Sequence, residues 1–177
     1  GQVLTVAAGR PVQALFHSRD FRHVPWNALG RIVEQSQALD WHRDRILELV
    51  DDERIREHRL AVFLDANGGA GGPLGRHLLE ALGCRQICQG CDADGVFGHE
   101  PEPINENLAA VAPLVARHGA AVGFVLDPDA DRLALIDETG RCLGEELTLA
   151  LAVRFRLEQQ RGPVVINMST SRAVEDV

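Results

Sequence analysis

Short runs of apolar residues alternate with amphipathic segments from residue 40 to the end of the sequence. A short continuous apolar run between turn signals is typical of a buried strand, and apolar positions three or four residues apart are typical of a helix. These patterns predict strands at residues 60–64, 85–89, 121–126 and 133–137, and helices at 41–56, 73–82, 105–119 and 145–160. The alternation predicts an α/β fold: a three-layer α/β/α domain with a mixed, mostly parallel sheet of about four strands.

Glycine, proline and capping residues refine this prediction. Gly9 and Pro11 are expected to interrupt any helix near the start of the chain. Asp40 is a suitable N-cap for the following helix, and Pro113 predicts a kink inside a later one. The apolar run 164–167 predicts a further strand, and the sequence then ends within an apparent helix opening. We therefore expect these residues to belong to a longer protein.

The composition excludes several classes of function. The chain has 177 residues, of which 45% are hydrophobic and 25% charged, as in an ordinary soluble globular protein. All 18 residues counted as Lys or Arg are arginine, which excludes a Walker A loop and Schiff-base chemistry. The net charge of −8 argues against a nucleic-acid partner. No apolar run approaches about 18 residues and no signal peptide is visible, so we expect no membrane partner and a cytoplasmic location.

Three of the four cysteines have a spacing that suggests a metal cluster. Cys84, Cys88 and Cys91 form C-x3-C-x2-C, which resembles the cluster loop of radical S-adenosylmethionine enzymes. However, Cys88 falls within a predicted strand, whereas cluster ligands must converge from one loop. We therefore interpret the cysteines as reduced thiols and expect no iron–sulfur cluster.

The strongest chemical signal is the run Asp-Pro-Asp-Ala-Asp-Arg between two predicted strands. Its carboxylates, Asp127, Asp129 and Asp131, repel one another unless a cation lies among them or water solvates them. Carboxylate oxygens at this spacing suit a hard divalent cation, Mg²⁺ or Ca²⁺. The adjacent Arg132 could hold a phosphate oxygen through its planar guanidinium. The alternative interpretation is a solvated acidic turn.

Two other kinds of acidic loop fit less well. With Asp127 as the first position of an EF-hand, Glu138 falls at the twelfth, but Arg132 replaces the glycine of the sharp turn. The predicted flanking elements are also strands, whereas an EF-hand needs helices. The loop of a haloacid-dehalogenase-like phosphatase would have Thr or Val in place of Asp131, and a lysine later in the chain.

The acidic loop resembles the metal loop of the α-D-phosphohexomutases, which include phosphomannomutases, phosphoglucomutases and phosphoglucosamine mutases. Other stretches resemble the same family in order and spacing. They are residues 67–71 with 78–83, similar to the opening of its second domain; residues 99–103 with 106–108, similar to its Pro-Glu-Pro loop and following helix; and residues 167–172, similar to the opening of its third domain. The resemblance covers about residues 40–177.

The resemblance implies a function and a role for each site residue. In this family a phosphoserine of the first domain gives its phosphoryl group to a hexose phosphate, which interconverts hexose 1-phosphate and hexose 6-phosphate. By matching position, Asp127, Asp129 and Asp131 would hold Mg²⁺ against the phosphoserine. Arg132 would contact the phosphate of that serine. Phosphoryl transfer depends mostly on positioning and on neutralising charge, so these residue types suit it.

The resemblance also implies domain boundaries. Residues 1–39 would be the end of the first domain and a linker, residues 40–161 the metal-binding second domain, and residues 162–177 the truncated start of the third. The family's Ser-His-Asn or Ser-His-Asp loop is not found around any of the serines, which are Ser18, Ser36, Ser169 and Ser171. The sugar-binding and phosphate-binding loops of the third and fourth domains are also missing.

These departures predict an incomplete enzyme. We expect the chain alone to be inactive, with the missing first, third and fourth domains and a hexose phosphate as its partners in the parent enzyme. The identity of the hexose stays open. A non-enzymatic calcium-binding module is the alternative function, and helices on both sides of residues 127–138 would favour it.

Overall fold

The computed structural model describes residues 4–177, which divide into two compact units. The first unit ends at Gln35 and contains helix α1 (Val6–Ser18) and the 3₁₀ turn η1 (Trp26–Ala28). The expectation that Gly9 and Pro11 prevent a helix was therefore wrong. Thr5 caps α1 by accepting a hydrogen bond from the backbone of the first turn, which offsets part of the cost of the internal proline.

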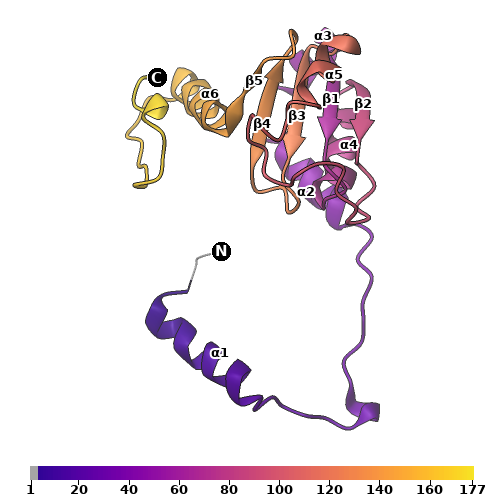
Figure 1. The fold of residues 1–177 in the computed structure, drawn as a ribbon, viewed down its shortest axis with the longest axis vertical. Coiled ribbons are helices and arrows are strands. Elements are labelled where there is room, and N and C mark those ends of the chain that lie inside the picture. Colours follow the sequence, from indigo (N-terminus) through magenta and orange to yellow (C-terminus); the bar gives the residue numbers. More distant parts are fainter. Residues whose placement is uncertain (1–3) are drawn as a thin grey trace. The chain divides into compact units, whose positions relative to one another are not determined.

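The second unit, from Ser36 to Val177, is built on a five-stranded sheet (Figure 1). Its strands are β1 (Ala61–Asp65), β2 (Arg85–Gln89), β3 (Val122–Leu126), β4 (Leu133–Asp137) and β5 (Cys142–Leu143). Its helices are α2 (Ala38–Leu47), α3 (Asp52–His58), α4 (Gly71–Ala81), α5 (Ala112–Arg117), α6 (Gly144–Gln159) and the 3₁₀ turn η2 (Arg172–Val174). Within residues 4–177, every helix is too short or too polar to span a bilayer.

The strands lie in the order β2-β1-β3-β4-β5 (Figure 1). Strand β1 is parallel to β2 and β3, whereas β3–β4 and β4–β5 are antiparallel pairs. The α/β fold with a mixed sheet is confirmed, with one more strand than the prediction. The strand expected at residues 164–167 is not formed, because an apolar run becomes a strand only where another strand pairs with its backbone, and the sheet ends at β5.

Both faces of the sheet are buried, which confirms the three layers. Alternate residues of β1 point to opposite faces: Phe63 belongs to one apolar cluster, and Val62 and Leu64 to the other. Helix α5 and the turns before it cover the first face with Leu108, Val111, Ala112 and Val115. Helix α4 covers the second face through Leu79, and α2 packs against α4.

Two predicted helices begin differently in the structure. The 105–119 segment is helical only from Ala112, and Pro113 lies in the first turn of α5 rather than at a kink. The missing N–H of a proline costs nothing there, because the first N–H groups of a helix have no intrahelical partner. Helix α2 begins at Ala38, so Asp40 lies in its first turn rather than at its N-cap.

The β4–β5 turn generates a prediction about pH. Asp137 Oδ1 accepts hydrogen bonds from Thr139 Oγ1 at 2.6 Å, Thr139 N at 3.0 Å and Arg141 N at 2.9 Å. These bonds, that of the Thr139 hydroxyl first, lower the pKa of Asp137 below its usual value of 3.8. A carboxylate with a lowered pKa stabilises the fold above its unfolded pKa, and that stability is lost as the pH falls through the folded pKa.

We therefore expect Asp137→Asn to lower the free energy of unfolding near neutral pH. The difference from wild type should shrink as the pH falls below 3.8. Urea unfolding over a pH series measures it, with Glu138→Gln, a change of an exposed neighbouring carboxylate, as the control. A pH-independent difference would contradict the assigned role of the Asp137 charge.

Candidate metal and phosphate site

Two loops meet at the edge of the sheet where β1 and β3 end. Because these strands are parallel, residues 66–70 and residues 127–132 leave the sheet side by side. Ala70 N donates a hydrogen bond to Pro128 O at 2.8 Å. A Cβ atom on Gly69 would lie 2.6 Å from that same oxygen. The glycine-rich loop is therefore packed directly against the acidic loop and supports it.

The acidic loop is a hairpin connection between β3 and β4. Leu126 pairs with Leu133 at its base, and Asp127 N donates to Arg132 O at 3.4 Å. Ala130 N donates to Asp127 O at 3.1 Å, and Ala130 has a left-handed backbone with φ of 61°. This tight path turns alternate side chains of the loop inward.

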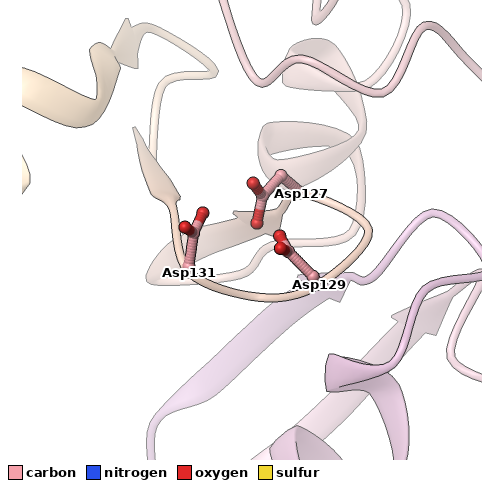
Figure 2. Close-up of side chains that lie close together, drawn as sticks. All are labelled: Asp127, Asp129 and Asp131. Atoms are coloured by element: carbon pink, nitrogen blue, oxygen red, sulfur yellow. The ribbon is translucent and has the colours of Figure 1, made fainter. Parts of the chain in front are cut away.

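The loop brings the three predicted metal ligands together. Figure 2 shows the side chains of Asp127, Asp129 and Asp131 pointing towards one another from the same loop. One carboxylate oxygen from each residue lies within 4.8 Å of the others. Asp127 is 2% exposed, whereas Asp129 and Asp131 are exposed to solvent. Three converging hard oxygen donors with an open side suit a divalent cation that keeps part of its water shell.

Arg132 binds the buried carboxylate of this group from two directions. Its backbone N–H donates to Asp127 Oδ1 at 3.1 Å, and its Nε donates to Asp127 Oδ2 at 2.9 Å. Its Nη1 lies 3.4 Å from Glu102 Oε1, and its Nε lies 3.8 Å from Asp131 Oδ1. Sequence analysis selected Arg132 as a phosphate ligand, and the structure also shows it as a counter-ion of the acidic loop.

The carboxylates of the loop have opposite pKa shifts. Burial of Asp127 raises its pKa, but hydrogen bonds from the backbone and side chain of Arg132 outweigh that effect, so the net shift is downward. The pKa of Asp131 is raised by its hydrogen bond with Asp127 and by the charges of Asp129 and Asp127. The loop therefore keeps an excess of negative charge after Arg132 is counted, and a cation would relieve it.

A buried polar network fixes a third loop beside the first two. Asn67 Oδ1 accepts hydrogen bonds from Gly98 N at 2.8 Å and His99 N at 3.2 Å, and Asn67 Nδ2 donates to His99 O at 2.9 Å. His99 Nε2 lies 3.3 Å from Oδ2 of the fully buried Asp65. Burial raises the pKa of Asp65, which also accepts a hydrogen bond from Gln89 Nε2 at 2.9 Å.

This network carries the segment from which Glu102 reaches Arg132. Sequence analysis noted residues 99–103 only for their resemblance to a family loop and gave none of them a role in the site. The contacts join residues 30 or more positions apart, such as Asn67 with His99 and Glu102 with Arg132. No periodicity signals such a pairing.

An open cavity of about 490 Å³ adjoins the acidic loop. Asp131 and Arg132 form part of its wall, together with residues of α6 and of the segment 167–171. The side chains of this last segment are mutually hydrogen-bonded: Asn167 Oδ1 accepts from Ser169 Oγ at 2.9 Å and Thr170 Oγ1 at 2.8 Å. Arg132 thus lies between the acidic loop and a space large enough for a small ligand.

The structure bears on both alternative interpretations of metal binding. Strand β3 precedes residues 127–138 and strand β5 follows them, so the helices on both sides that would favour a calcium module of the EF-hand type are not found there. Cys88 lies in β2 as predicted, and the buried Cys91 thiol donates to Leu64 O at 3.5 Å. Burial and the neighbouring Cys88 raise the pKa of Cys91 to about 12, which disfavours the thiolate that a cluster requires.

Comparisons with known proteins identify the family of this chain. Residues 41–140 match the family described as "Phosphoglucomutase/phosphomannomutase, alpha/beta/alpha domain II". A "Probable phosphoglucosamine mutase" of Methanosarcina barkeri is 33% identical over 177 residues, which cover 99% of this chain and 40% of that protein. A "Phosphoglucomutase/phosphomannomutase" of Thermococcus kodakarensis is 33% identical over 168 residues, or 94% of this chain and 37% of the relative.

Solved structures show the same fold. A phosphoglucomutase/phosphomannomutase family protein of Burkholderia thailandensis superposes with a TM-score of 0.64 at 26% identity, covering 96% of this chain and 37% of that one. A putative phosphomannomutase of Thermus thermophilus gives 0.72 at 20% identity over 84% of this chain and 35% of the other, which supports the fold alone. The chain thus spans about 40% of the length of its relatives. Since the domain II match covers more than half of its 177 residues, the chain belongs to the phosphoglucomutase/phosphomannomutase family.

Proposed function

We propose that this chain contributes the Mg²⁺-binding domain of a phosphohexomutase, which interconverts hexose 1-phosphate and hexose 6-phosphate through a phosphoserine located outside the chain. The observation that carries the proposal is the convergence of the three loop carboxylates within 4.8 Å, beside an arginine that faces a cavity. The mutase names of the relatives in the same family support the reaction class.

The residues of the acidic loop would have two functions, metal binding and phosphate binding. Asp127, Asp129 and Asp131 would hold Mg²⁺, which when bound neutralises negative charge on phosphoryl oxygens. Arg132 would bind a phosphate through its planar guanidinium, since it lies on the cavity wall. Without a cation, Asp127 holds that guanidinium in place through the bond to its Nε.

The proposal also assigns the flanking segments. Residues 1–39 would belong to the end of the first domain and a linker, 40–161 to the second domain, and 162–177 to the start of the third. The two serines beside the cavity already have structural roles: Ser169 Oγ donates to Asn167, and Ser171 Oγ accepts from Ala173 N at 3.2 Å. This supports a phosphoserine elsewhere in the parent enzyme.

The substrate and location follow from the same proposal. The partners would be a hexose phosphate and the other domains of the parent enzyme, with no role for nucleic acid or membrane. The four cysteines are free thiols, which agrees with the reducing cytoplasm where we propose that the enzyme acts.

The first test is metal affinity. The wild-type chain should bind Mg²⁺ weakly, because three carboxylates leave about half of an octahedral shell to water. Asp129→Asn should lower the affinity by about tenfold or more, because even outer-shell partners of a metal are worth roughly 10–100-fold. Titration calorimetry measures both values, with Mg²⁺ and Ca²⁺ in separate titrations.

Glu138→Gln is the matched control, since it removes an exposed carboxylate that an EF-hand would need and the proposed site does not. Unchanged affinity in Asp129→Asn would contradict the assigned ligands. A loss of Ca²⁺ binding in Glu138→Gln would favour the calcium module instead.

The second test concerns the support of the acidic loop. Gly69→Ala places a Cβ 2.6 Å from Pro128 O, so one of the two loops must move. We expect the free energy of unfolding to fall by about 1–3 kcal/mol and the Mg²⁺ affinity to fall with it. Gly162→Ala, where no atom lies within 4 Å of the added Cβ, is the control. Wild-type stability and affinity in Gly69→Ala would show that the close approach is dispensable.

The third test is activity. The purified chain should unfold cooperatively and convert neither mannose 1-phosphate nor glucose 1-phosphate to the 6-phosphate, even with a hexose bisphosphate activator. The physical reason is that a cation and Arg132 stabilise charge on a phosphoryl group but cannot carry it between two sugar oxygens. Turnover in a coupled assay would show that the nucleophile lies within these 177 residues.

A further inference from the structure

Arg132 is already bound to Asp127, the most buried of the three proposed metal ligands. Asp127 is 2% exposed, and Arg132 engages both of its oxygens, one through the backbone N–H and one through Nε. The side chain of Asp131, by contrast, is 74% exposed and lies at the longer distance of 3.8 Å from Arg132 Nε. The guanidinium therefore lies closer to Asp127, the most buried proposed ligand, than to Asp131.

A divalent cation at the triad would meet this charge at close range. Like charges repel strongly when they share a partly buried carboxylate, because little water screens them. A cation that takes an electron pair of Asp127 must therefore weaken the bond from Arg132 Nε. The guanidinium would then be held more strongly by its remaining contacts.

Glu102 makes one of these remaining contacts. Its Oε1 lies 3.4 Å from Arg132 Nη1, at the opposite end of the guanidinium from the Nε that binds Asp127. The side chain of Glu102 is 60% exposed, so a charge that it holds stays at the rim of the site. The buried contacts of Asn67 and His99 fix the loop that carries Glu102.

We propose that Arg132 and the divalent cation compete for Asp127, and that Glu102 is the positioning residue that holds the Arg132 guanidinium at the cavity wall when the cation is bound. The inference rests on the proposed metal site and adds to it a coupling between cation entry and the arginine. Without a cation, Arg132 neutralises Asp127. With a cation, the guanidinium is released towards Glu102 and towards an anionic group in the cavity.

Calorimetric titration with MgCl₂ tests the competition. Arg132→Gln should raise the Mg²⁺ affinity by about fivefold or more, because it removes the competing charge. Glu102→Gln should lower the affinity in the wild-type background, because Arg132 then depends more on Asp127. In the Arg132→Gln background the same change should have only the small effect of a distant charge. Glu100→Gln, an exposed carboxylate on the same loop, calibrates that small effect in both backgrounds.

The double-mutant cycle separates this inference from the proposed function. If Asp129→Asn abolishes binding but Arg132→Gln leaves the affinity unchanged, the metal site stands and the competition is overturned. An equal effect of Glu102→Gln in both backgrounds overturns the positioning role. If neither wild type nor Arg132→Gln binds Mg²⁺, both the metal site and the competition are overturned.

The NMR signal of the Arg132 Nε–H group gives a second readout that a purely structural role would not move. In the cation-free chain this N–H donates to Asp127 at 2.9 Å, so its proton should be shifted downfield and protected from exchange. Addition of MgCl₂ should shift this signal and speed up the exchange of its proton with water. The signal is assigned by its disappearance in Arg132→Lys. A signal that stays in place while Mg²⁺ binds would overturn the proposal.

Discussion

The burial of Asp127 is the constraint on which the rest of the site depends. A carboxylate that is 2% exposed is stable in its charged form only if hydrogen bonds replace the lost water. Here both oxygens are satisfied by a single residue, Arg132, whose backbone N–H and Nε can reach them together only if the hairpin loop closes tightly. The left-handed backbone of Ala130 is part of that closure. The ion pair between Asp127 and Arg132 therefore both compensates the buried charge and closes the loop.

Close backbone approach and buried hydrogen bonds also join the three loops at this edge of the sheet. Gly69 lets the first loop approach Pro128 of the acidic loop, and Asn67 ties the first loop to His99. His99 Nδ1 lies 2.8 Å from the carbonyl oxygen Glu100 O, to which it can only donate, and its Nε2 lies 3.3 Å from Asp65 Oδ2. Together with the hydrogen bonds of Asn67, these contacts keep the third loop in place.

The sequence predicted most of the fold because the central strands β1, β3 and β4 appear as apolar runs. The residues 85–89 and 133–137 were identified with their observed bounds, whereas β5 has only two residues and leaves no such pattern. The apolar run at 164–167 was wrongly predicted as a strand, because a sequence pattern does not show whether a neighbouring strand is present to pair with it. Local signals identify an element, and only tertiary pairing decides whether it forms.

The candidate site shows the same division. The acidic triad was found because its members lie two residues apart, so one loop must bring them together. The roles of Asn67, His99 and Glu102 were missed, because each depends on a partner about 30 positions away. Sequence reasoning found the groups that carry charge and missed the groups that hold them in place.

The arrangement of the three carboxylates bears on how the site would select its cation. Asp127 is buried and its Oδ1 accepts from the backbone N–H of Arg132, whereas Asp129 and Asp131 are exposed on a short loop and can adjust to different ionic radii. One rigid ligand and two adaptable ones do not by themselves fix the coordination geometry of the cation. Mg²⁺ differs from Ca²⁺ mainly in its demand for a near-ideal octahedron. Selectivity would then come from groups that complete the coordination shell from outside the loop. The cavity beside Asp131 and Arg132 is the open side from which such a group, a phosphate in the proposed reaction, would approach.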